Sequence, residues 1–465
     1  MSGRLIVVSN RVPSDGPPSG GLVVALHETL QAEGGLWIGT SGETVESPGP
    51  LRDIDGDGYK MKVFDLTNDE YEGYYLSYAN SVLWPLCHRR SDLISLSAGS
   101  FDVYDGVNKR LAEMIAPLVE PDDLVWVHDY HFMPLAAHLR EQGVKATIGY
   151  FHHIPFPTTH DLGALPERKH FPDWIAAFDL VGLQTQNDVS TALELYRGLN
   201  GAEMAHDGSL YYHDRRFEVH SFPIGIDGHA FHASAKDQDG RALLNLSPQE
   251  QLVIGVDRLD YSKGLGNRFR AFARYLETRK DDEPKAALLQ IAPPTREEVQ
   301  AYQEVREELE LIAGRENGIH SELGWTPIRY IHRAIPRDQL ASLYRAATVG
   351  LVTPVADGMN LVAKEYVAAQ DADDPGVLIL SAFAGAAEQM EAALIVNPYD
   401  IEEMAGAIRQ ALSMPLKERQ DRHKWLFKGV IEDDVANWTQ SYLKTLQGIP
   451  ARAAAQAERM SLYPA

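Results

Sequence analysis

The chain has 465 residues, 44% of them hydrophobic and 23% charged, a composition typical of globular proteins that excludes disorder as the main state. Its length suits two domains of roughly two hundred residues each rather than a single core. The formal net charge of −23 disfavours general binding to nucleic acid or to anionic membranes, so any phosphate must be held by a few locally placed cations.

Short, β-branched apolar runs separated by helical patterns predict two series of buried parallel strands. The first series covers Leu5–Val8, Leu124–Val127, Ala146–Phe151, Asp179–Leu183 and Glu218–Phe222. The second series covers Leu252–Val256, Ala287–Ile291, Ala347–Thr353, Val377–Ser381 and Leu394–Val396. This alternation predicts an α/β protein with two doubly wound sheets. Because ligands of such sheets bind beyond the carboxyl ends of the strands, we expect site residues directly after the strands.

The domain boundary is predicted at Phe222-Pro-Ile-Gly-Ile-Asp227, where Pro and Gly follow a strand. We therefore expect an N-terminal Rossmann-like domain over residues 1–225 and a C-terminal one over residues 226–432. A helix over residues 433–450 is expected to cross back to the N-terminal domain. Residues 451–465 form an Ala-rich tail that is expected to be frayed or weakly helical.

The first strand is followed by Ser9-Asn10-Arg11 and by a loop that ends in Ser19-Gly20-Gly21-Leu22. A helix that begins at Gly21 would let backbone N–H groups approach an anion closely, because the two glycines carry no side chain. A plain strand-to-helix turn explains the same residues equally well.

Histidines follow the second and third predicted strands, in His128-Asp129-Tyr130-His131 and in His152-His153-Ile154-Pro155. We predict no metal site, because these histidines lie in two strand-end loops without a His-x-x-Glu pattern on a helix and without cysteines. One or two of them are expected to orient sugar hydroxyls, and the others to be hydrogen-bonded structural residues.

The first strand of the second series ends in Asp257-Arg258-Leu259-Asp260-Tyr261-Ser262-Lys263-Gly264. Two cations between a strand and a helix suit a diphosphate whose negative charge grows as it leaves. A solvated loop with surface ion pairs is the alternative. No Gly-x-x-x-x-Gly-Lys-Ser/Thr motif occurs, which disfavours a P-loop ATPase.

Arg296 is another cation that follows the end of a predicted strand. The alternative is that Arg296 lies at a helix start and pairs with Glu297 or Glu298.

The most informative stretch runs from Val352 to Tyr366, where a strand, a turn at Asp357-Gly358 and a helix follow one another. Asn360 or Asp357 would cap this helix. Backbone N–H groups at its start would hold phosphate or sugar oxygens. Glu365 lies one turn after Leu361 and would accept hydrogen bonds from ribose hydroxyls. A buried helix with a capping Asp is the alternative.

Cys87 is the only cysteine, so the chain forms no intrachain disulfide, which fits a reducing cytoplasm. The N-terminus lacks the layout of a signal peptide, and no apolar run approaches the length of a membrane span. We therefore expect a cytoplasmic protein.

Taken together, these stretches resemble the trehalose-6-phosphate synthases, retaining glycosyltransferases of family 20, from Leu5 to about Leu446. The most specific stretches are Ser9–Arg11, Gly20–Leu22, Val82–Pro85, Trp126–His131, His153–Pro157, Arg258–Leu265, Gly324–Pro327 and Asp357–Tyr366. The resemblance implies the GT-B fold, in which two Rossmann-like domains face an interdomain cleft. It also implies transfer of glucose with retention from UDP-glucose to glucose 6-phosphate, giving α,α-trehalose 6-phosphate and UDP.

The resemblance further implies roles for individual residues. Those implied for the acceptor are Arg11, Tyr75 and Arg296 at its phosphate, Asp129 at its hydroxyls, and Trp84 and Ile154 where the two anomeric carbons meet. Those implied for the donor are Gly20 and Gly21, Arg258 and Lys263 at the diphosphate, Ile335 near the base, Leu361, Val362, Ala363, Lys364 and Glu365 at the diphosphate and ribose, and Asp357, Gly358, Met359, Asn360 and His153 at the glucose. The implied catalytic residues are Asp129, His153, Arg258, Lys263 and Asp357.

The family is thought to use front-face attack, in which the departing diphosphate helps to deprotonate the acceptor hydroxyl. No pair of carboxylates at glycosidase-like spacing is evident, so double displacement is not indicated. No metal or other cofactor is expected, because Arg258 and Lys263 replace the metal. The sequence departs from common members at Thr40, which follows Trp37-Ile-Gly39 where Trp is frequent, and at His152, where an apolar residue is frequent.

Three other functions fit the sequence less well. A glucosylglycerol-phosphate synthase would use ADP-glucose and glycerol 3-phosphate, but Arg11, Tyr75 and the complete Arg258–Leu265 stretch argue against it. A catalytically silent sugar-phosphate sensor should have lost a diphosphate cation or Asp357, and the chain keeps both. A nicotinamide-dependent dehydrogenase is disfavoured because Gly-x-Gly-x-x-Gly is missing. The resemblance favours uridine as the base of the donor, and guanosine and adenosine remain alternatives. The sequence is also compatible with a homo-oligomer.

Overall fold

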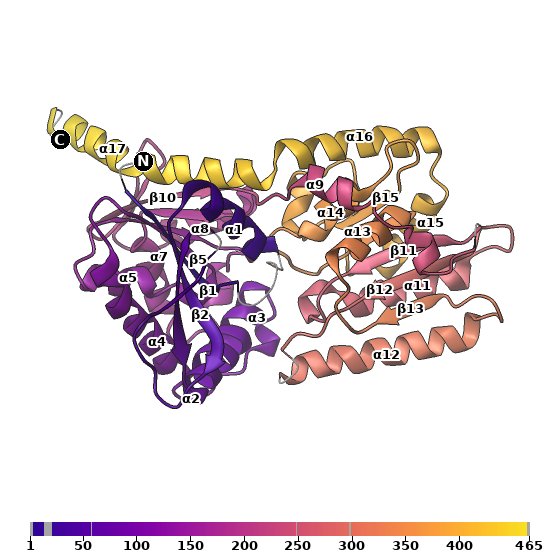
Figure 1. Ribbon diagram of the computed structural model, residues 1–465, viewed down its shortest axis with the longest axis horizontal. Helices are drawn as coiled ribbons and strands as arrows, with labels where there is room; N and C mark the ends of the chain where they lie inside the picture. The colour runs from indigo at the N-terminus through magenta and orange to yellow at the C-terminus, as the bar shows by residue number, and fades with distance from the viewer. Residues whose placement is uncertain (1–2, 14–20, 57, 248, 297–298, 463–465) are drawn as a thin grey trace. The chain divides into compact units, whose positions relative to one another are not determined.

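The computed structural model describes residues 3–13, 21–56, 58–247, 249–296 and 299–462 (Figure 1). The chain divides into two compact units. The first unit consists of Met1–Pro223 together with Ala436–Ala465, and the second of Ile224–Val435.

The first unit is built on a sheet that has ten strands within the described residues. Their order is β3 (Arg52–Ile54), β4 (Lys60–Leu66), β2 (Leu36–Thr44), β1 (Leu5–Arg11), β5 (Leu124–His128), β6 (Thr147–Phe151), β7 (Leu180–Leu183), β10 (Arg215–Ser221), β9 (Leu210–Tyr212) and β8 (Ala202–Met204). The seven neighbours from β4 to β10 run parallel. At the two edges, β3, β9 and β8 pair antiparallel.

Helices connect and cover these strands. They are α1 (Gly21–Glu33), α2 (Asn68–Glu70), a π-helix η1 (Tyr71–Leu83), α3 (Trp84–Cys87), α4 (Ser100–Ile115), α5 (Leu135–Glu141), α6 (Thr159–Leu162), α7 (Phe171–Ala176), α8 (Gln186–Arg197) and α17 (Val435–Leu462). Short 3-10 turns are η2 (Ser91–Leu93), η3 (Ala116–Leu118), η4 (Tyr130–Phe132) and η5 (Arg168–His170).

The C-terminal helix α17 completes the core of the first unit. Tyr442 donates a hydrogen bond to the Tyr150 carbonyl at 3.1 Å, and its ring stacks on Trp126 with centroids 4.6 Å apart. A Cβ at Gly149 would lie 2.3 Å from the Tyr442 hydroxyl, so the close approach of helix and strand requires glycine there. The helix continues to Leu462, into the Ala-rich segment that we expected to be frayed or weakly helical.

The second unit contains a parallel sheet, six-stranded within the described residues. Its order is β13 (Ile328–Ile331), β12 (Ala286–Ile291), β11 (Gln251–Val256), β14 (Val349–Val352), β15 (Val377–Ser381) and β16 (Leu394–Val396). Its helices are α9 (Gly228–Ser234), α10 (Gly240–Leu243), α11 (Leu265–Thr278), α12 (Gln300–His320), α13 (Arg337–Ala346), α14 (Leu361–Ala369), α15 (Ile401–Leu412) and α16 (Leu416–Glu432), with 3-10 turns η6 (Tyr261–Lys263) and η7 (Gly385–Glu388). Phe269, Phe272 and Ile408 are fully buried in its core.

The predicted α/β fold with two largely parallel sheets is confirmed, and all ten predicted strands are present, with ends that shift by up to three residues. The strands that the sequence pattern missed are β2, β3, β4, β8, β9 and β13. They lie toward the edges of the sheets, and their apolar runs are too short to stand out. In Ile-Arg-Tyr-Ile of β13, for example, an arginine interrupts the run. Within the described residues, no helix combines the length and the apolar character needed to cross a membrane.

A buried arginine joins three strand ends of the second unit. Arg268 of α11 is 0% exposed, and its Nη1 lies 2.8 Å from Asp257 Oδ2. Nη1 also donates to Gln290 Oε1 at 2.9 Å, and Nε donates to Thr353 Oγ1 at 3.1 Å. Burial raises the pKa of Asp257, although the charge of Arg268 opposes this rise. The side chain of Arg268 therefore ties the end of β12 to the loops after β11 and β14.

Replacing Arg268 should destabilise the second unit. Arg268→Ala leaves the carboxylate of Asp257 buried without its cation, which costs about 3–5 kcal/mol of unfolding free energy. Urea unfolding followed by intrinsic fluorescence measures this loss. Arg270→Ala is the matched control on the same helix, because Arg270 is half exposed and pairs with Glu308 at the surface. A loss from Arg268→Ala as small as that of the control would contradict the structural role of the pair.

Candidate active site

In the first unit, two polar loops meet at the carboxyl ends of β5 and β6. The strands are parallel neighbours, with His128 opposite Phe151, so the residues that follow them lie side by side. Asp129 has a φ of 72°, rare for a non-glycine residue, and its Oδ1 accepts a hydrogen bond from the backbone N–H of His153 at 3.2 Å. His128 Nδ1 lies 3.0 Å from His153 Nε2. The two predicted site residues, Asp129 and His153, are therefore in direct contact.

Burial keeps three histidines of these loops, His128, His152 and His153, in their neutral form. Burial lowers the pKa of His128 well below its ordinary value and lowers the pKa values of His152 and His153 to about 3. His152 is hydrogen-bonded through its ring to the Tyr150 hydroxyl at 2.8 Å and to the Pro155 carbonyl at 3.3 Å. It is thus a structural residue, as expected for some of the histidines. Within the described residues, no group of three or more His, Cys, Asp or Glu side chains is placed to hold a metal ion.

A pocket of about 260 Å³ in the first unit brings Arg11 and Tyr75 together. Arg11 ends β1 and is exposed, and Tyr75 projects from the π-helix η1. Thr40 also lines this pocket, and its hydroxyl donates to the Asn10 carbonyl at 2.6 Å. The full lining is Asn10, Arg11, Thr40, Gly42, Glu43, Thr44, Leu66, Asn68, Tyr71 and Tyr75. A cation, a phenol and hydroxyl groups in one small pocket suit a phosphate group.

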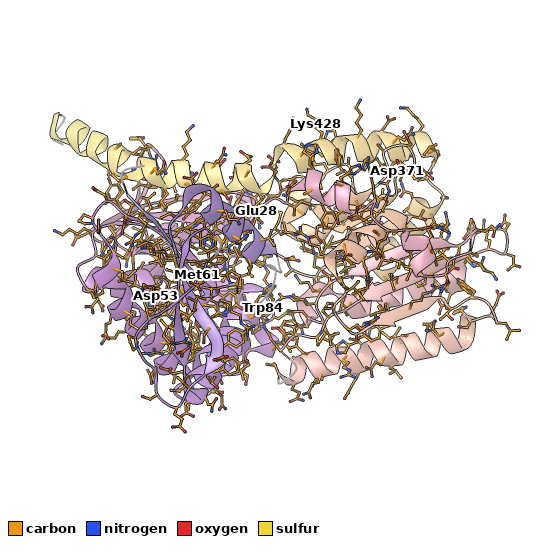
Figure 2. All side chains as sticks on the ribbon, in the orientation of Figure 1. Glu28, Asp53, Met61, Trp84, Asp371 and Lys428 are labelled. Atoms are coloured by element: carbon orange, nitrogen blue, oxygen red, sulfur yellow. The ribbon has the colours of Figure 1, made fainter. Side chains whose placement is uncertain are left out.

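The remaining predicted residues of this unit occupy different surroundings. Trp84, labelled in Figure 2, is 4% exposed, and its ring packs on His88 with centroids 4.1 Å apart. Ile154 is 8% exposed and directly follows His153. Helix α1 begins at Gly21, as predicted, while Gly20 lies outside the described residues.

In the second unit, an ion pair links the loops after β11 and β14. Lys263 Nζ lies 2.6 Å from Asp357 Oδ2, and Asn360 Nδ2 donates to the same oxygen at 3.0 Å. Gly264 has a φ of 64°, and a Cβ there would lie 2.5 Å from the Thr353 carbonyl oxygen, so only glycine lets the two loops approach this closely. Arg258 is exposed in the same loop. Both predicted diphosphate cations thus lie in the loop between β11 and α11.

Helix α14 begins at Leu361, and Asn360 is its N-cap. Asn360 has a φ of 87°, and its Oδ1 accepts from the Ala363 N–H at 3.2 Å. The first N–H groups of a helix lack partners within the helix, and the partly exposed Leu361 and Val362 occupy these positions. Gly358 and Met359 form the buried turn that leads into the helix. This helix start is suited to anionic or hydroxyl oxygens.

The two charged residues of α14, Lys364 and Glu365, differ in their burial and in their hydrogen bonding. Lys364 is 2% exposed, and its ammonium donates to the Ile224 carbonyl and to Gln389 Oε1, each at 2.8 Å. Only the backbone of Lys364 is therefore available to a ligand. Glu365 is partly exposed, and its carboxylate has no hydrogen-bond partner among the described residues. Burial raises the pKa of Glu365 to about 7, although Arg337 lowers it in part.

Arg296 and Ile335 also belong to the second unit. Arg296 has a φ of 48°, and its Nη1 donates to the Tyr302 hydroxyl at 2.7 Å and lies 3.8 Å from Asp260 Oδ2. The alternative partners Glu297 and Glu298 lie outside the described residues. Ile335 is partly exposed in the loop before α13. Arg296 therefore lies in a different unit from Arg11 and Tyr75.

Several residues of these sites were not predicted. His128 was seen only as part of a histidine run, and its bond to His153 follows from strand pairing. Asp260 and Tyr302 hold Arg296, and Arg268 supports the Asp257 loop. Position after a strand could have indicated Asp260, but α11 and α12 gave no signal for Arg268 or Tyr302 because both belong to helical patterns.

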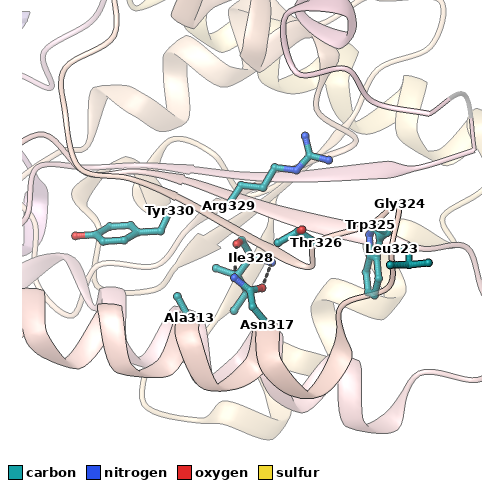
Figure 3. A pocket seen from close by; sticks show the side chains of 9 residues that line it. All are labelled: Ala313, Asn317, Leu323, Gly324, Trp325, Thr326, Ile328, Arg329 and Tyr330. Carbon is teal, nitrogen blue, oxygen red and sulfur yellow. Dashed lines mark hydrogen bonds between the residues drawn. The ribbon is translucent and has the colours of Figure 1, made fainter.

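A second pocket, of about 640 Å³, lies between α12 and β13 (Figure 3). It includes Trp325 from the Gly324–Pro327 stretch. The side-chain amide of Asn317 is hydrogen-bonded to the backbone of Ile328. The guanidinium of Arg329 donates to the Leu244 carbonyl and to the carboxylate of Glu250. Because its strongest polar groups are already paired, we assign no ligand to this pocket.

The chain is similar to known proteins over nearly its whole length. The model of glycosyltransferase family 20 matches residues 10–448. The chain is 43% identical over 457 residues to trehalose-6-phosphate synthase of Enterobacter sp. (strain 638), covering 97% of this chain and 96% of the relative.

The chain is also similar to solved structures, including that of a trehalose-phosphate synthase. A UDP-forming α,α-trehalose-phosphate synthase from Burkholderia xenovorans in complex with glucose 6-phosphate aligns with a TM-score of 0.91 at 42% identity, over 96% of this chain and 100% of that one. A protein from E. coli bound with UDP-2-fluoro glucose aligns with a TM-score of 0.92 at 42% identity, over 96% of this chain and 99% of that one.

The raised pKa of Glu365 predicts a pH-dependent stability. Its carboxyl is ordinarily half-ionised near 4.5 and in the folded chain near 7, so ionisation as the pH rises through this window destabilises the folded state. Glu365→Gln should therefore raise the free energy of unfolding by about 1–3 kcal/mol at about pH 8, and by much less at about pH 5. Urea titrations at the two pH values measure the difference. Glu432→Gln, at an exposed carboxylate paired with Lys428, is the control. Equal effects of Glu365→Gln at both pH values would argue against a Glu365 that holds its proton in the folded chain.

Proposed function

This chain belongs to glycosyltransferase family 20, and we propose that it transfers glucose with retention from UDP-glucose to glucose 6-phosphate, giving α,α-trehalose 6-phosphate and UDP. The observation that carries the proposal is the 43% identity over nearly the whole chain to proteins named trehalose-6-phosphate synthase. Structures of similar proteins with glucose 6-phosphate and with UDP-2-fluoro glucose support this acceptor and this donor. The protein is thus a UDP-forming hexosyltransferase of the GT-B class.

The donor half-site lies in the second unit under this proposal. Arg258 and Lys263 bind the diphosphate, and the start of α14 binds diphosphate and ribose through backbone N–H groups and Glu365. Asp357, Gly358, Met359 and Asn360 hold the transferred glucose, and Ile335 lies near the base. The contact of Lys263 with Asp357 supports these assignments, because one ion pair connects the diphosphate and glucose positions.

The acceptor half-site centres on the first unit. Arg11 and Tyr75 bind the phosphate of glucose 6-phosphate, which the 260 Å³ pocket supports. Asp129 binds the sugar hydroxyls of the acceptor. Arg296 is proposed as a further phosphate ligand from the second unit. Trp84 and Ile154 pack near the reacting carbons.

Chemically, this chain acts by positioning and by charge stabilisation. As the bond from the anomeric carbon to the diphosphate breaks, negative charge grows on the diphosphate oxygens, and Arg258 and Lys263 stabilise it. The acceptor hydroxyl attacks the same face of the anomeric carbon, and its proton passes to a departing diphosphate oxygen, so retention needs no enzyme nucleophile. The carboxylate of Asp357 is already held by Lys263 and Asn360, which suits a hydrogen-bonding role better than nucleophilic attack.

Location follows from the same proposal. Both substrates are charged, water-soluble sugar phosphates, and the single cysteine suits a reducing compartment. We therefore place the enzyme in the cytoplasm.

The direct test is to identify the product. The full chain is incubated with UDP-, GDP- or ADP-glucose and with glucose 6-phosphate or glycerol 3-phosphate, and the product is analysed by mass spectrometry and NMR. We expect α,α-trehalose 6-phosphate, formed fastest from UDP-glucose. Glucosylglycerol phosphate as the main product, or no transfer with any pair, would refute the proposal.

Substitutions in the two half-sites should change different kinetic constants. Arg258→Ala should lower kcat by roughly 10–100-fold with little change in the Michaelis constant for glucose 6-phosphate, because a charge-assisted contact to the leaving group contributes about 1.5–3 kcal/mol. Arg11→Ala and Arg296→Ala should instead raise the Michaelis constant for glucose 6-phosphate. Initial rates of UDP release, with each substrate varied in turn, measure both effects.

The control for these kinetics is Lys62→Ala, at a surface pair with Asp53 in the first unit, which should leave all constants unchanged. If Arg11→Ala and Arg296→Ala raised only the constant for UDP-glucose, the donor and acceptor assignments would be reversed.

A further inference from the structure

His128 is the last residue of β5, and the proposed function gives it no role. It is fully buried, and its Nδ1 lies 3.0 Å from His153 Nε2. Its ring packs against Trp126, with centroids 4.5 Å apart, and against Trp438 at 6.4 Å. The ring neighbours of His128 are therefore aromatic, and His153 is the one that shares a hydrogen bond with it.

The two histidine rings share a single hydrogen bond. Burial keeps the pKa values of both rings low, so each is a neutral imidazole with one N–H and one bare nitrogen. In their contact one ring must donate and the other accept. The direction of this bond decides which nitrogen of His153 carries the proton.

The second nitrogen of His128 sets the direction. Its Nε2 is buried and has no hydrogen-bond partner among the described residues. A proton on this nitrogen would create an orphaned buried N–H, which is rare in folded proteins and costly. With its proton on Nδ1, His128 instead donates to His153 and leaves only a bare nitrogen against the aromatic rings.

We propose that His128 is a positioning residue that donates from Nδ1 to Nε2 of His153 and thereby fixes the tautomer in which His153 carries its proton on Nδ1. This inference rests on the proposed function and on the role that the family resemblance implies for His153, at the transferred glucose. Nε2 of His153 is hydrogen-bonded to His128, and the backbone N–H of His153 donates to Asp129. Nδ1 is therefore the ring nitrogen left for a sugar hydroxyl, and it meets that hydroxyl as a donor.

Fixing the tautomer beforehand has a kinetic advantage. A ring that already presents N–H to the hydroxyl oxygen needs no proton rearrangement when the sugar binds. Without His128, either nitrogen of His153 would carry the proton, and part of the population would face the hydroxyl with a bare nitrogen.

The tautomer is measured directly by nitrogen NMR. In the full chain with 15N-labelled histidine and no substrate, the ring signals of His153 are assigned by comparison with His153→Gln. We expect a protonated Nδ1 and a bare Nε2. His128→Leu should give a mixture of both tautomers, and His128→Asn, whose amide can donate from near the Nδ1 position, should restore most of the Nδ1–H form. A bare Nδ1 in the unsubstituted chain would overturn the proposal without any variant.

Kinetics give the second readout. His128→Leu should lower kcat/KM for UDP-glucose by about 10-fold, with the Michaelis constant for glucose 6-phosphate within about twofold, and His128→Asn should recover most of this loss. Trp126→Phe is the packing control, because it alters the surroundings of His128 and keeps the hydrogen bond. Equal losses in the Leu and Asn variants, or a changed tautomer in the control, would reduce His128 to a packing residue.

The tautomer measurement needs no substrate, so it separates the two proposals. A chain with the expected tautomer that makes no trehalose 6-phosphate contradicts the proposed function and leaves the His128–His153 bond standing. An active enzyme with the opposite tautomer contradicts only the role of His128.

Discussion

Parallel pairing of neighbouring strands is the constraint on which both half-sites depend. β5 lies beside β6 in the first unit, and β11 beside β14 in the second, so each pair of strands ends at a common edge. Residues far apart in the chain, such as Lys263 and Asp357, then meet within hydrogen-bonding distance. The left-handed backbone at Asp129, Gly264 and Asn360 turns the chain sharply at these edges. Each polar cluster is thus a consequence of sheet topology, with local turns adjusting its geometry.

Electrostatic pairing prepares the cations for anionic ligands. The chain has a formal charge of −23, yet its site cations are individually held: Lys263 by Asp357, and Arg296 by Asp260 and Tyr302. Such pairing keeps long side chains extended in one direction and lowers the entropy lost on binding. A phosphate group that reaches these cations adds to existing networks, while Arg258 and Arg11 remain more exposed. The acidic remainder of the molecule limits binding of other polyanions.

The sequence predicted the central strands and the loops that follow them, because buried parallel strands are continuous apolar runs and the site residues directly follow them. Motif resemblance then indicated the family. Three features were beyond such reasoning. Lys364 carries its charge into the interior, Arg296 is held by Tyr302 from the next helix, and His128 bonds to His153 across two strands. Each depends on side-chain direction and on distances between segments, which neither periodicity nor spacing along the chain encodes.

The chain order of the first unit affects how the protein is made. Its sheet is formed by residues before Pro223, but Trp438 and Tyr442 of α17 complete its core against Trp126 and the glycine-lined strands β6 and β7. A ribosome therefore synthesises the whole second unit before the first can close. During translation the apolar face around Trp126 therefore remains exposed to solvent until α17 has been synthesised. Exposed apolar surface of this kind makes a nascent chain prone to aggregation and is bound by chaperones. The second unit, continuous from Ile224 to Val435, has no such delay.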